Sequence, residues 1–174
     1  AYAHYGIEPG DKVVVISRNQ AHWAVCFLAA MTYGAVPVPL LHEFKPGNIH
    51  YLVNHSDAKI LFVERAIWDG LSSDDMPGLT AVIQIEDYQL LHLKEGATEA
   101  ARAQLDRMYK KKYPRGIRPE DLDYFEDGPE DLAILSYTSG TSGFSKGVMI
   151  PYRAVWSNVY FMHENLPMND NTST

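Results

Sequence analysis

Short apolar runs alternate with segments of helical periodicity over the first 90 residues of the chain. Four runs rich in β-branched and other apolar residues predict strands at residues 12–17, 35–40, 59–63 and 81–85. The first run is continuously apolar, which suits a strand buried on both faces. Strands that alternate with helices predict an α/β fold, a mostly parallel sheet flanked by helices.

Two helices are predicted between these strands. The first is expected to begin after Asn19 as N-cap and to end at Gly34, where a left-handed cap suits glycine. The second begins at Pro46, a residue favoured in the first helical turn. Their apolar faces are predicted to consist of Trp23, Cys26, Phe27, Ala30 and Met31 in the first helix and of Ile49, Leu52 and Val53 in the second.

Proline and glycine residues indicate where the regular pattern weakens. Pro37 and Pro39 each remove a backbone donor, so the run at residues 35–40 is predicted to form an edge strand. From about residue 90 the alternation stops. One amphipathic helix is predicted from near Thr98, with Ala101, Leu105, Met108 and Tyr109 on its apolar face, and an irregular connection follows to about residue 129.

The charge pattern argues against nucleic acid as a partner. The formal net charge is −7, and a phosphate backbone would need a localised basic face. The main basic cluster, residues 110–118, is followed at once by an acidic run at residues 120–131, so the two largely cancel. A solvated surface segment is therefore favoured over a partner site.

Composition predicts a soluble cytoplasmic protein without a metal site. No apolar run reaches the roughly 18 residues that a membrane-spanning helix needs, and no secretory signal pattern opens the sequence. The single cysteine, Cys26, lies in an apolar helical pattern and is predicted to be a core residue. None of the seven histidines has the spacing of a metal-ligand pair, so no metal ligand is assigned.

Candidate chemistry is concentrated in residues 132–151, LAILSYTSGTSGFSKGVMIP. An apolar strand at residues 133–137 leads into residues 138–147, where hydroxyl side chains and glycines precede Lys146 and no acidic residue occurs. Glycines let backbone N–H groups approach an anion, hydroxyls donate further hydrogen bonds, and the lysine adds a mobile positive charge. The loop is thus predicted to bind phosphate.

Two other interpretations of this loop are less favourable. Serine, threonine and glycine also dominate plain surface turns, but here a β pattern resumes immediately at Val148. A Walker A loop would need glycine where Ser145 stands, and a metal-binding hydroxyl where Gly147 stands. A helix would also have to follow. The pattern predicts a strand-loop-strand unit instead.

The segment TSGTSGFSKGV resembles the phosphate-loop signature of the adenylate-forming (AMP-binding) superfamily, which includes acyl-CoA synthetases, adenylation domains of peptide synthetases and luciferases. Residues 8–15, 34–40 and 58–63 resemble the N-terminal part of that family in the same order. Ser142 stands where threonine is more usual, and Ser145 where proline is common. Within the signature, the resemblance assigns ATP-phosphate binding to Thr138, Ser139, Gly140, Thr141, Ser142, Gly143 and Lys146.

The family's chemistry is implied by the same resemblance. Its members join a carboxylic acid to ATP, release pyrophosphate and form an acyl-adenylate, from which coenzyme A displaces AMP. ATP, Mg²⁺ and coenzyme A are therefore the expected cofactors, and the acid, ATP and CoA the expected small-molecule partners. A bacterial long-chain fatty-acid–CoA ligase is the most similar branch. Aryl, amino and short-chain acids remain alternatives.

By this resemblance the chain corresponds to an N-terminal piece of such a ligase. Residues 1–128 are expected to form an α/β subdomain, and residues 129–174 to begin the ATP-binding subdomain with the loop and one helix. The expected apolar face of that helix consists of Val155, Val159, Met162 and Leu166. No catalytic residue is expected in this chain, which is predicted to be inactive alone, whereas a longer parent could touch membranes peripherally. The alternative is a non-catalytic nucleotide-binding or carrier-interaction module of Rossmann-like architecture.

Overall fold

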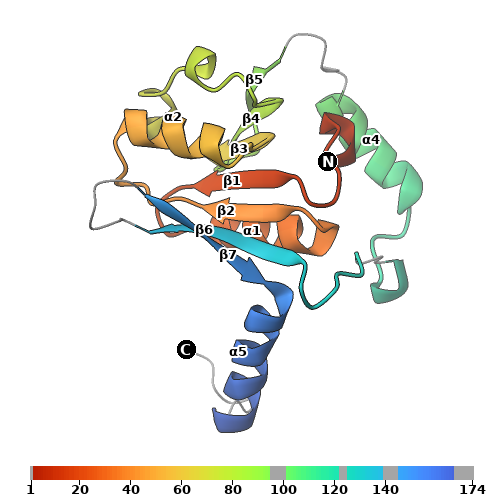
Figure 1. Cartoon of the computed structure of the whole chain (residues 1–174). Coiled ribbons are helices and arrows are strands. Elements are labelled where there is room, and N and C mark those ends of the chain that lie inside the picture. Colours follow the sequence, from red (N-terminus) through yellow and green to blue (C-terminus); the bar gives the residue numbers. More distant parts are fainter. Residues whose placement is uncertain (1, 95–100, 122–124, 139–144, 167–174) are drawn as a thin grey trace.

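The computed structural model describes residues 2–94, 101–121, 125–138 and 145–166 (Figure 1). A five-stranded sheet forms its centre, in the order β2-β1-β3-β4-β5. Its strands are β1 (Lys12–Ile16), β2 (Val36–Pro39), β3 (Ile60–Val63), β4 (Ala81–Gln84) and β5 (Leu90–Leu93). The first four pair in parallel, and β5 pairs with β4 antiparallel. The predicted class, a mostly parallel sheet flanked by helices, is confirmed.

The four predicted strands are present within one or two residues of their expected bounds. β2, which contains Pro37 and Pro39, pairs only with β1 in this sheet, so its edge position is confirmed. β5 was missed, because residues 90–93 were assigned to the irregular connection. Its sequence, LLHL, has no β-branched residue, unlike the four predicted strands, and all four of its residues are only partly buried.

Helices α1 (Ala21–Tyr33) and α2 (Pro46–His55) pack against the sheet. Gly34 adopts the predicted left-handed conformation, with φ 84°, and its N–H caps carbonyls of the last turn of α1. The predicted N-cap was wrong by one residue. Gln20, not Asn19, is the last extended residue before α1, and no side chain makes a capping hydrogen bond there.

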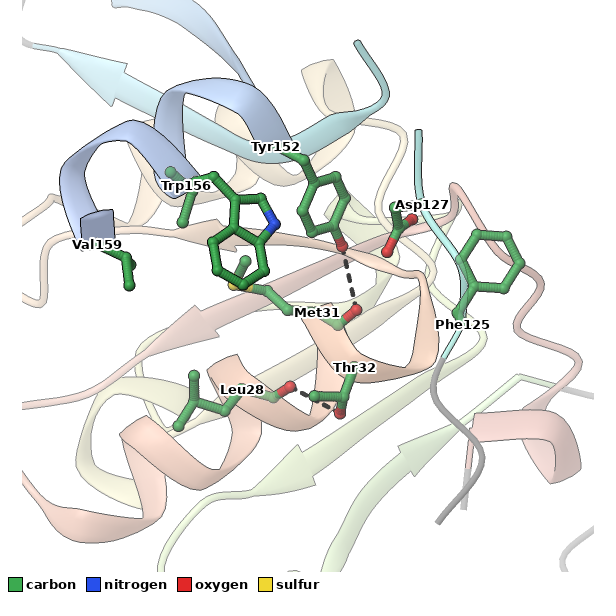
Figure 2. Close-up of a pocket in the computed structure, with 9 residues that line it drawn as sticks. Leu28, Met31, Thr32, Phe125, Asp127, Tyr152, Trp156 and Val159 are labelled. Atoms are coloured by element: carbon green, nitrogen blue, oxygen red, sulfur yellow. Dashed lines mark hydrogen bonds between the residues drawn. The ribbon is translucent and has the colours of Figure 1, made fainter. Parts of the chain in front are cut away.

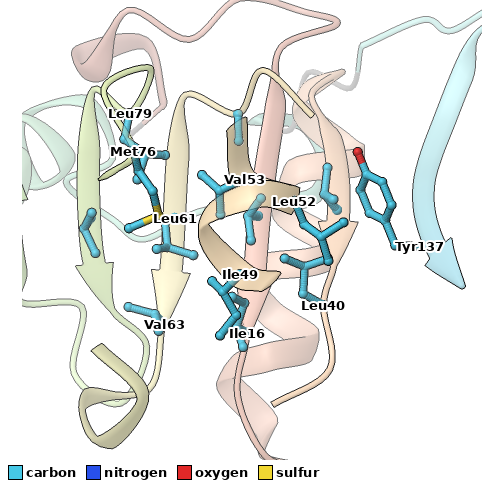
Figure 3. Packing of buried hydrophobic residues seen from close by; sticks show 14 residues of the cluster. Ile16, Leu40, Ile49, Leu52, Val53, Leu61, Val63, Met76, Leu79 and Tyr137 are labelled. Carbon is cyan, nitrogen blue, oxygen red and sulfur yellow. The ribbon is translucent and has the colours of Figure 1, made fainter. Parts of the chain in front are cut away.

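Two apolar clusters lie against opposite faces of the sheet. Val14 and Ile16 of β1 belong to the cluster beneath α2, which contains the predicted inner residues Ile49, Leu52 and Val53 (Figure 3). Val13 and Val15 belong to the second cluster, which includes Cys26 and Ala30 of α1. Successive side chains of a strand point to opposite faces, so a continuous apolar run fills both layers.

Short elements complete the first 121 residues. They are η1 (Tyr2–Tyr5), α3 (Arg65–Trp68), η2 (Ser73–Asp75), α4 (Ala101–Lys112) and η3 (Pro119–Asp121). The predicted start of α4 near Thr98 lies outside the described residues. Met108 and Tyr109 of its expected apolar face are 46% and 48% exposed, so these two do not pack into a core.

The last three elements contain a second, two-stranded sheet that packs beside the first. β6 (Leu132–Thr138) and β7 (Lys146–Pro151) make an antiparallel hairpin, and α5 (Tyr152–Asn165) follows. β6 lies beside β2, whereas α5 extends away from both sheets (Figure 1). None of the residues of α5 is buried, so its predicted apolar face is largely open to solvent. We refer to these three elements as the hairpin unit.

Candidate functional site

The predicted strand-loop-strand arrangement is confirmed by the β6–β7 hairpin. Apolar and β-prone residues on both sides of the glycine- and serine-rich segment pair with each other in antiparallel register. The pairing continues up to Thr138 and Lys146, which are directly opposite each other. The two ends of the predicted phosphate loop therefore emerge side by side from the same end of the hairpin.

Two of the seven predicted site residues lie in the described part of the chain. Thr138 ends β6 and Lys146 begins β7, and both are exposed. Within the described residues Lys146 makes no ion pair, so its ammonium group is available to an external anion. The other predicted residues, Ser139, Gly140, Thr141, Ser142 and Gly143, lie outside the described residues.

The loop end of the hairpin is attached to the central sheet through Tyr137. Its hydroxyl oxygen lies 2.7 Å from Nδ1 of His55, the last residue of α2. Burial, and to a lesser extent the nearby Tyr51 and Asp57, raise the pKa of the Tyr137 hydroxyl. Sequence reasoning missed this contact because 82 positions separate the two residues and no local spacing signals it.

The opposite end of the hairpin is attached to α1. Tyr152, at the start of α5, donates a hydrogen bond from its hydroxyl to the Met31 carbonyl at 3.1 Å (Figure 2). Burial is the main cause of a raised pKa of the Asp127 carboxyl, which lines the same cavity as Tyr152. These groups border a cavity of about 440 Å³ between α1 and α5, with Leu28, Trp156 and Val159 among its apolar walls.

Other candidate chemistry is sparse in the described residues. Within them, no group of three or more histidine, cysteine, aspartate or glutamate side chains could hold a metal ion. Cys26 is buried, as predicted for a core residue, and burial raises the pKa of its thiol to about 12. A thiol with that pKa is protonated at neutral pH and is a poor nucleophile. Among the described helices, none is long and apolar enough to span a membrane.

A family model described as "AMP-binding enzyme" matches residues 2–173. The chain belongs to the AMP-binding enzyme family. The match covers both the five-stranded sheet and the hairpin unit, so these two parts are common to one family and not a chance combination.

Curated relatives of this AMP-binding chain activate several acids, according to their names. Fatty acyl-CoA synthetase A of Dictyostelium discoideum is 30% identical over 91% of this chain and 23% of its own length. 4-Hydroxybutyrate–CoA ligase 2 of Metallosphaera sedula is 29% identical over 88% of this chain and 27% of its own. Long-chain-fatty-acid–CoA ligase 5 of rat is 25% identical over 90% of this chain and 23% of its own length. The chain thus spans about a quarter of the length of these relatives.

Solved structures share the fold. An anthranilate CoA ligase in complex with anthranoyl-AMP superposes with a TM-score of 0.71 and 21% identity, over 94% of this chain and 28% of that one. ATP-bound MatB from Rhodopseudomonas palustris gives a TM-score of 0.66 and 23% identity, over 93% of this chain and 29% of that one. At these identities the comparison supports the fold alone. It shows that the sheet and hairpin arrangement occurs in enzymes that handle ATP or an acyl-adenylate.

Proposed function

We propose that this chain provides the polyphosphate-binding hairpin of an ATP-dependent acyl-CoA synthetase, which joins a fatty acid to coenzyme A through an acyl-adenylate. One observation carries the proposal. Thr138 and Lys146, the first and last of the predicted phosphate-binding residues, are cross-strand partners at the loop end of a hairpin in a member of the AMP-binding enzyme family. A hydroxyl and a cation thus lie side by side at one end of the paired strands.

The proposed role of these residues is to bind the β- and γ-phosphates of ATP. When a carboxylate attacks the α-phosphate, negative charge grows on the departing pyrophosphate, and donors already in place stabilise that charge. Lys146 would supply a positive charge and Thr138 a hydroxyl donor, with residues 139–143 contributing backbone N–H groups and further hydroxyls. Lysine suits this role because its ammonium group acts as a mobile point charge on phosphate.

Mg²⁺ is compatible with the proposed site because the phosphates of ATP would supply most of its ligands. Magnesium usually binds through phosphate oxygens and water with only one or two protein carboxylates, so the described residues need not form a metal cluster. Bound to the phosphates, the ion would neutralise part of their charge. We propose that coenzyme A, the adenine group and the acyl group bind to those parts of the relatives' length that this chain does not span.

A long-chain fatty acid is the proposed substrate. We also propose that the protein belongs to the bacterial branch of long-chain fatty-acid–CoA ligases, which the sequence resembles most. Relatives from rat and Arabidopsis that are named as long-chain ligases or synthetases support a substrate with a long acyl chain. The 4-hydroxybutyrate ligase of similar identity keeps a short acid as the competing substrate. We also propose a cytoplasmic location, the start of an ATP-binding subdomain near residue 129, and no ligase activity for these 174 residues by themselves.

The proposal is tested by isotope exchange. A protein that joins this chain to the remaining length seen in the relatives should exchange labelled pyrophosphate into ATP only when a suitable acid is present. A panel of long-chain, short-chain, aromatic and amino acids identifies the substrate class. Absence of exchange with every acid, in a protein that is folded and binds ATP, would refute adenylate formation.

A matched pair of lysine variants tests the site. Lys146→Ala should reduce the exchange rate by about 10- to 150-fold, because a charged hydrogen bond contributes about 1.5–3 kcal/mol. Lys110→Ala removes another exposed lysine, from α4 and far from the hairpin in sequence, and should leave the rate unchanged. Equal rates for both variants would remove Lys146 from the phosphate site.

A further inference from the structure

The contact between His55 and Tyr137 joins the two units of the molecule at the proposed phosphate site. The hydroxyl–imidazole distance is 2.7 Å, and the two rings meet edge to face with centroids 5.6 Å apart. Tyr137 immediately precedes Thr138 at the end of β6. His55 ends α2, which packs on the five-stranded sheet. The contact therefore links the sheet unit to the strand end where the predicted loop begins.

The ring of Tyr137 is held on more than one side. It is 7% exposed and belongs to the same buried cluster as Leu40 and Leu52 (Figure 3). Across the hairpin it is opposite Gly147, where an added Cβ would lie only 3.3 Å from its Cε1 atom. Glycine at this position lets the ring lie close to β7, the strand that begins with Lys146. The tyrosine, itself part of β6, thus also packs against β7.

His55 is oriented as well. Tyr51, one helical turn earlier in α2, contacts the imidazole with ring centroids 5.6 Å apart. Burial raises the pKa of the Tyr137 hydroxyl, which therefore stays protonated at physiological pH. A phenylalanine at position 137 would fill the same space without the hydrogen bond. The hydrogen bond of the hydroxyl therefore fixes the position of the Tyr137 ring relative to His55, which apolar packing alone would not do.

We infer that the His55–Tyr137 pair is a positioning device for phosphate binding: it fixes the strand ends at Thr138 and Lys146 relative to the five-stranded sheet. In this proposal neither side chain binds the phosphate itself. The pair acts through the backbone of β6 and, across the hairpin, through Gly147 and β7. This inference rests on the proposed function, since it concerns the same phosphate site.

Two measurements on the 174-residue chain test the inference. NMR titration with inorganic pyrophosphate reports binding, and amide hydrogen exchange of residues 136–138 and 146–148 reports the stability of the strand ends. Tyr137→Phe should weaken pyrophosphate binding and speed this local exchange by about two- to tenfold, the effect of one lost neutral hydrogen bond. His55→Ala should act similarly, and the double variant should add little to either change.

Two further variants separate positioning from general stability. His55→Asn places a side-chain amide, which can accept or donate a hydrogen bond, near the position of Nδ1 and should recover part of the binding lost in His55→Ala. Tyr33→Phe removes a tyrosine hydrogen bond of similar length, 2.8 Å to the Ile7 carbonyl, on the face of the sheet opposite α2. It should lower overall stability to a comparable extent while leaving pyrophosphate binding and exchange at the strand ends unchanged.

The outcomes distinguish this inference from the proposed function. If the parent chain binds pyrophosphate and Lys146→Ala weakens binding, but Tyr137→Phe and Tyr33→Phe behave alike, the positioning role is wrong and the phosphate site stands. If the parent chain shows no pyrophosphate-dependent shifts at Thr138 or Lys146, the proposed function fails and the positioning role fails with it.

Discussion

The five-stranded sheet and the hairpin unit differ in how they use their apolar residues. In the sheet, Val14 and Leu61 are fully buried between helices and neighbouring strands. In the hairpin unit, Met149 of β7 is 69% exposed, and Trp156 and Phe161 of α5 are 66% and 64% exposed. One part of the molecule has a closed core, whereas the other leaves large apolar side chains in water.

This difference indicates which part is stable by itself. Burial of apolar surface is the main favourable term in folding, and the sheet obtains it from residues on both of its faces. The hairpin unit is held mainly where β6 lies beside β2 and where two tyrosines link it to α1 and α2. The proposed phosphate site therefore lies on the part with less buried apolar surface, which is attached to the well-packed sheet.

The largest expected effect comes from comparing two leucines. Leu61→Ala in β3 removes a side chain with no exposed surface and should lower the free energy of unfolding by about 2–5 kcal/mol. Leu166→Ala, at the end of α5, truncates a side chain that is 49% exposed and should cost less than about 0.5 kcal/mol. Urea denaturation of both variants measures this difference. Similar losses would show that the hairpin unit has a core of its own.

A smaller effect is expected at the far end of the hairpin. Tyr152→Phe removes the hydrogen bond to the Met31 carbonyl and should destabilise the chain by about 0.5–1.5 kcal/mol. Tyr160→Phe, which removes a hydroxyl from a side chain that is 67% exposed, serves as its control and should have no measurable effect. Thermal unfolding of the two variants checks the comparison, and equal midpoints would mean that the Tyr152 contact does not secure α5.

The smallest effect is a pH dependence at Asp127. Its pKa is raised above the ordinary 3.8, chiefly by burial, so ionisation is less favourable in the folded chain than in the unfolded chain. Its contribution to stability is therefore fully present below pH 3.8 and is lost as pH rises through the folded pKa. Asp127→Asn should match the parent in acid and become the more stable protein toward neutral pH. Parallel stability curves for the two proteins across this range would exclude the effect.

How far the sequence predicts this molecule depends on the range of the interactions involved. Strands such as β1 were predictable because a continuous β-branched run is a local signal of a doubly covered strand. β5 was not, since its partly buried residues depend on pairing with β4. The β6–β7 hairpin was predictable because its glycine- and serine-rich segment lies between two apolar runs. The His55–Tyr137 contact required the three-dimensional structure, because nothing near either residue specifies its partner.

The exposure of α5 was also beyond the sequence. The helical spacing of Val159 and Met162 correctly predicted an amphipathic helix, but periodicity gives only the direction of an apolar face and not what covers it. In the described structure these two side chains are 50% and 44% exposed. Periodicity therefore located the helix but not the surroundings of its apolar face.

The central claim is that polyphosphate binds at the loop end of the β6–β7 hairpin. NMR titration of the 174-residue chain with magnesium-ATP at physiological salt tests it most directly, with Lys146→Ala as the matched variant. The account predicts weak binding, with a dissociation constant near 1 mM or above, and amide shifts centred on Thr138 and Lys146 that diminish in the variant. Shifts centred on the five-stranded sheet, or binding unaffected by Lys146→Ala, would contradict it.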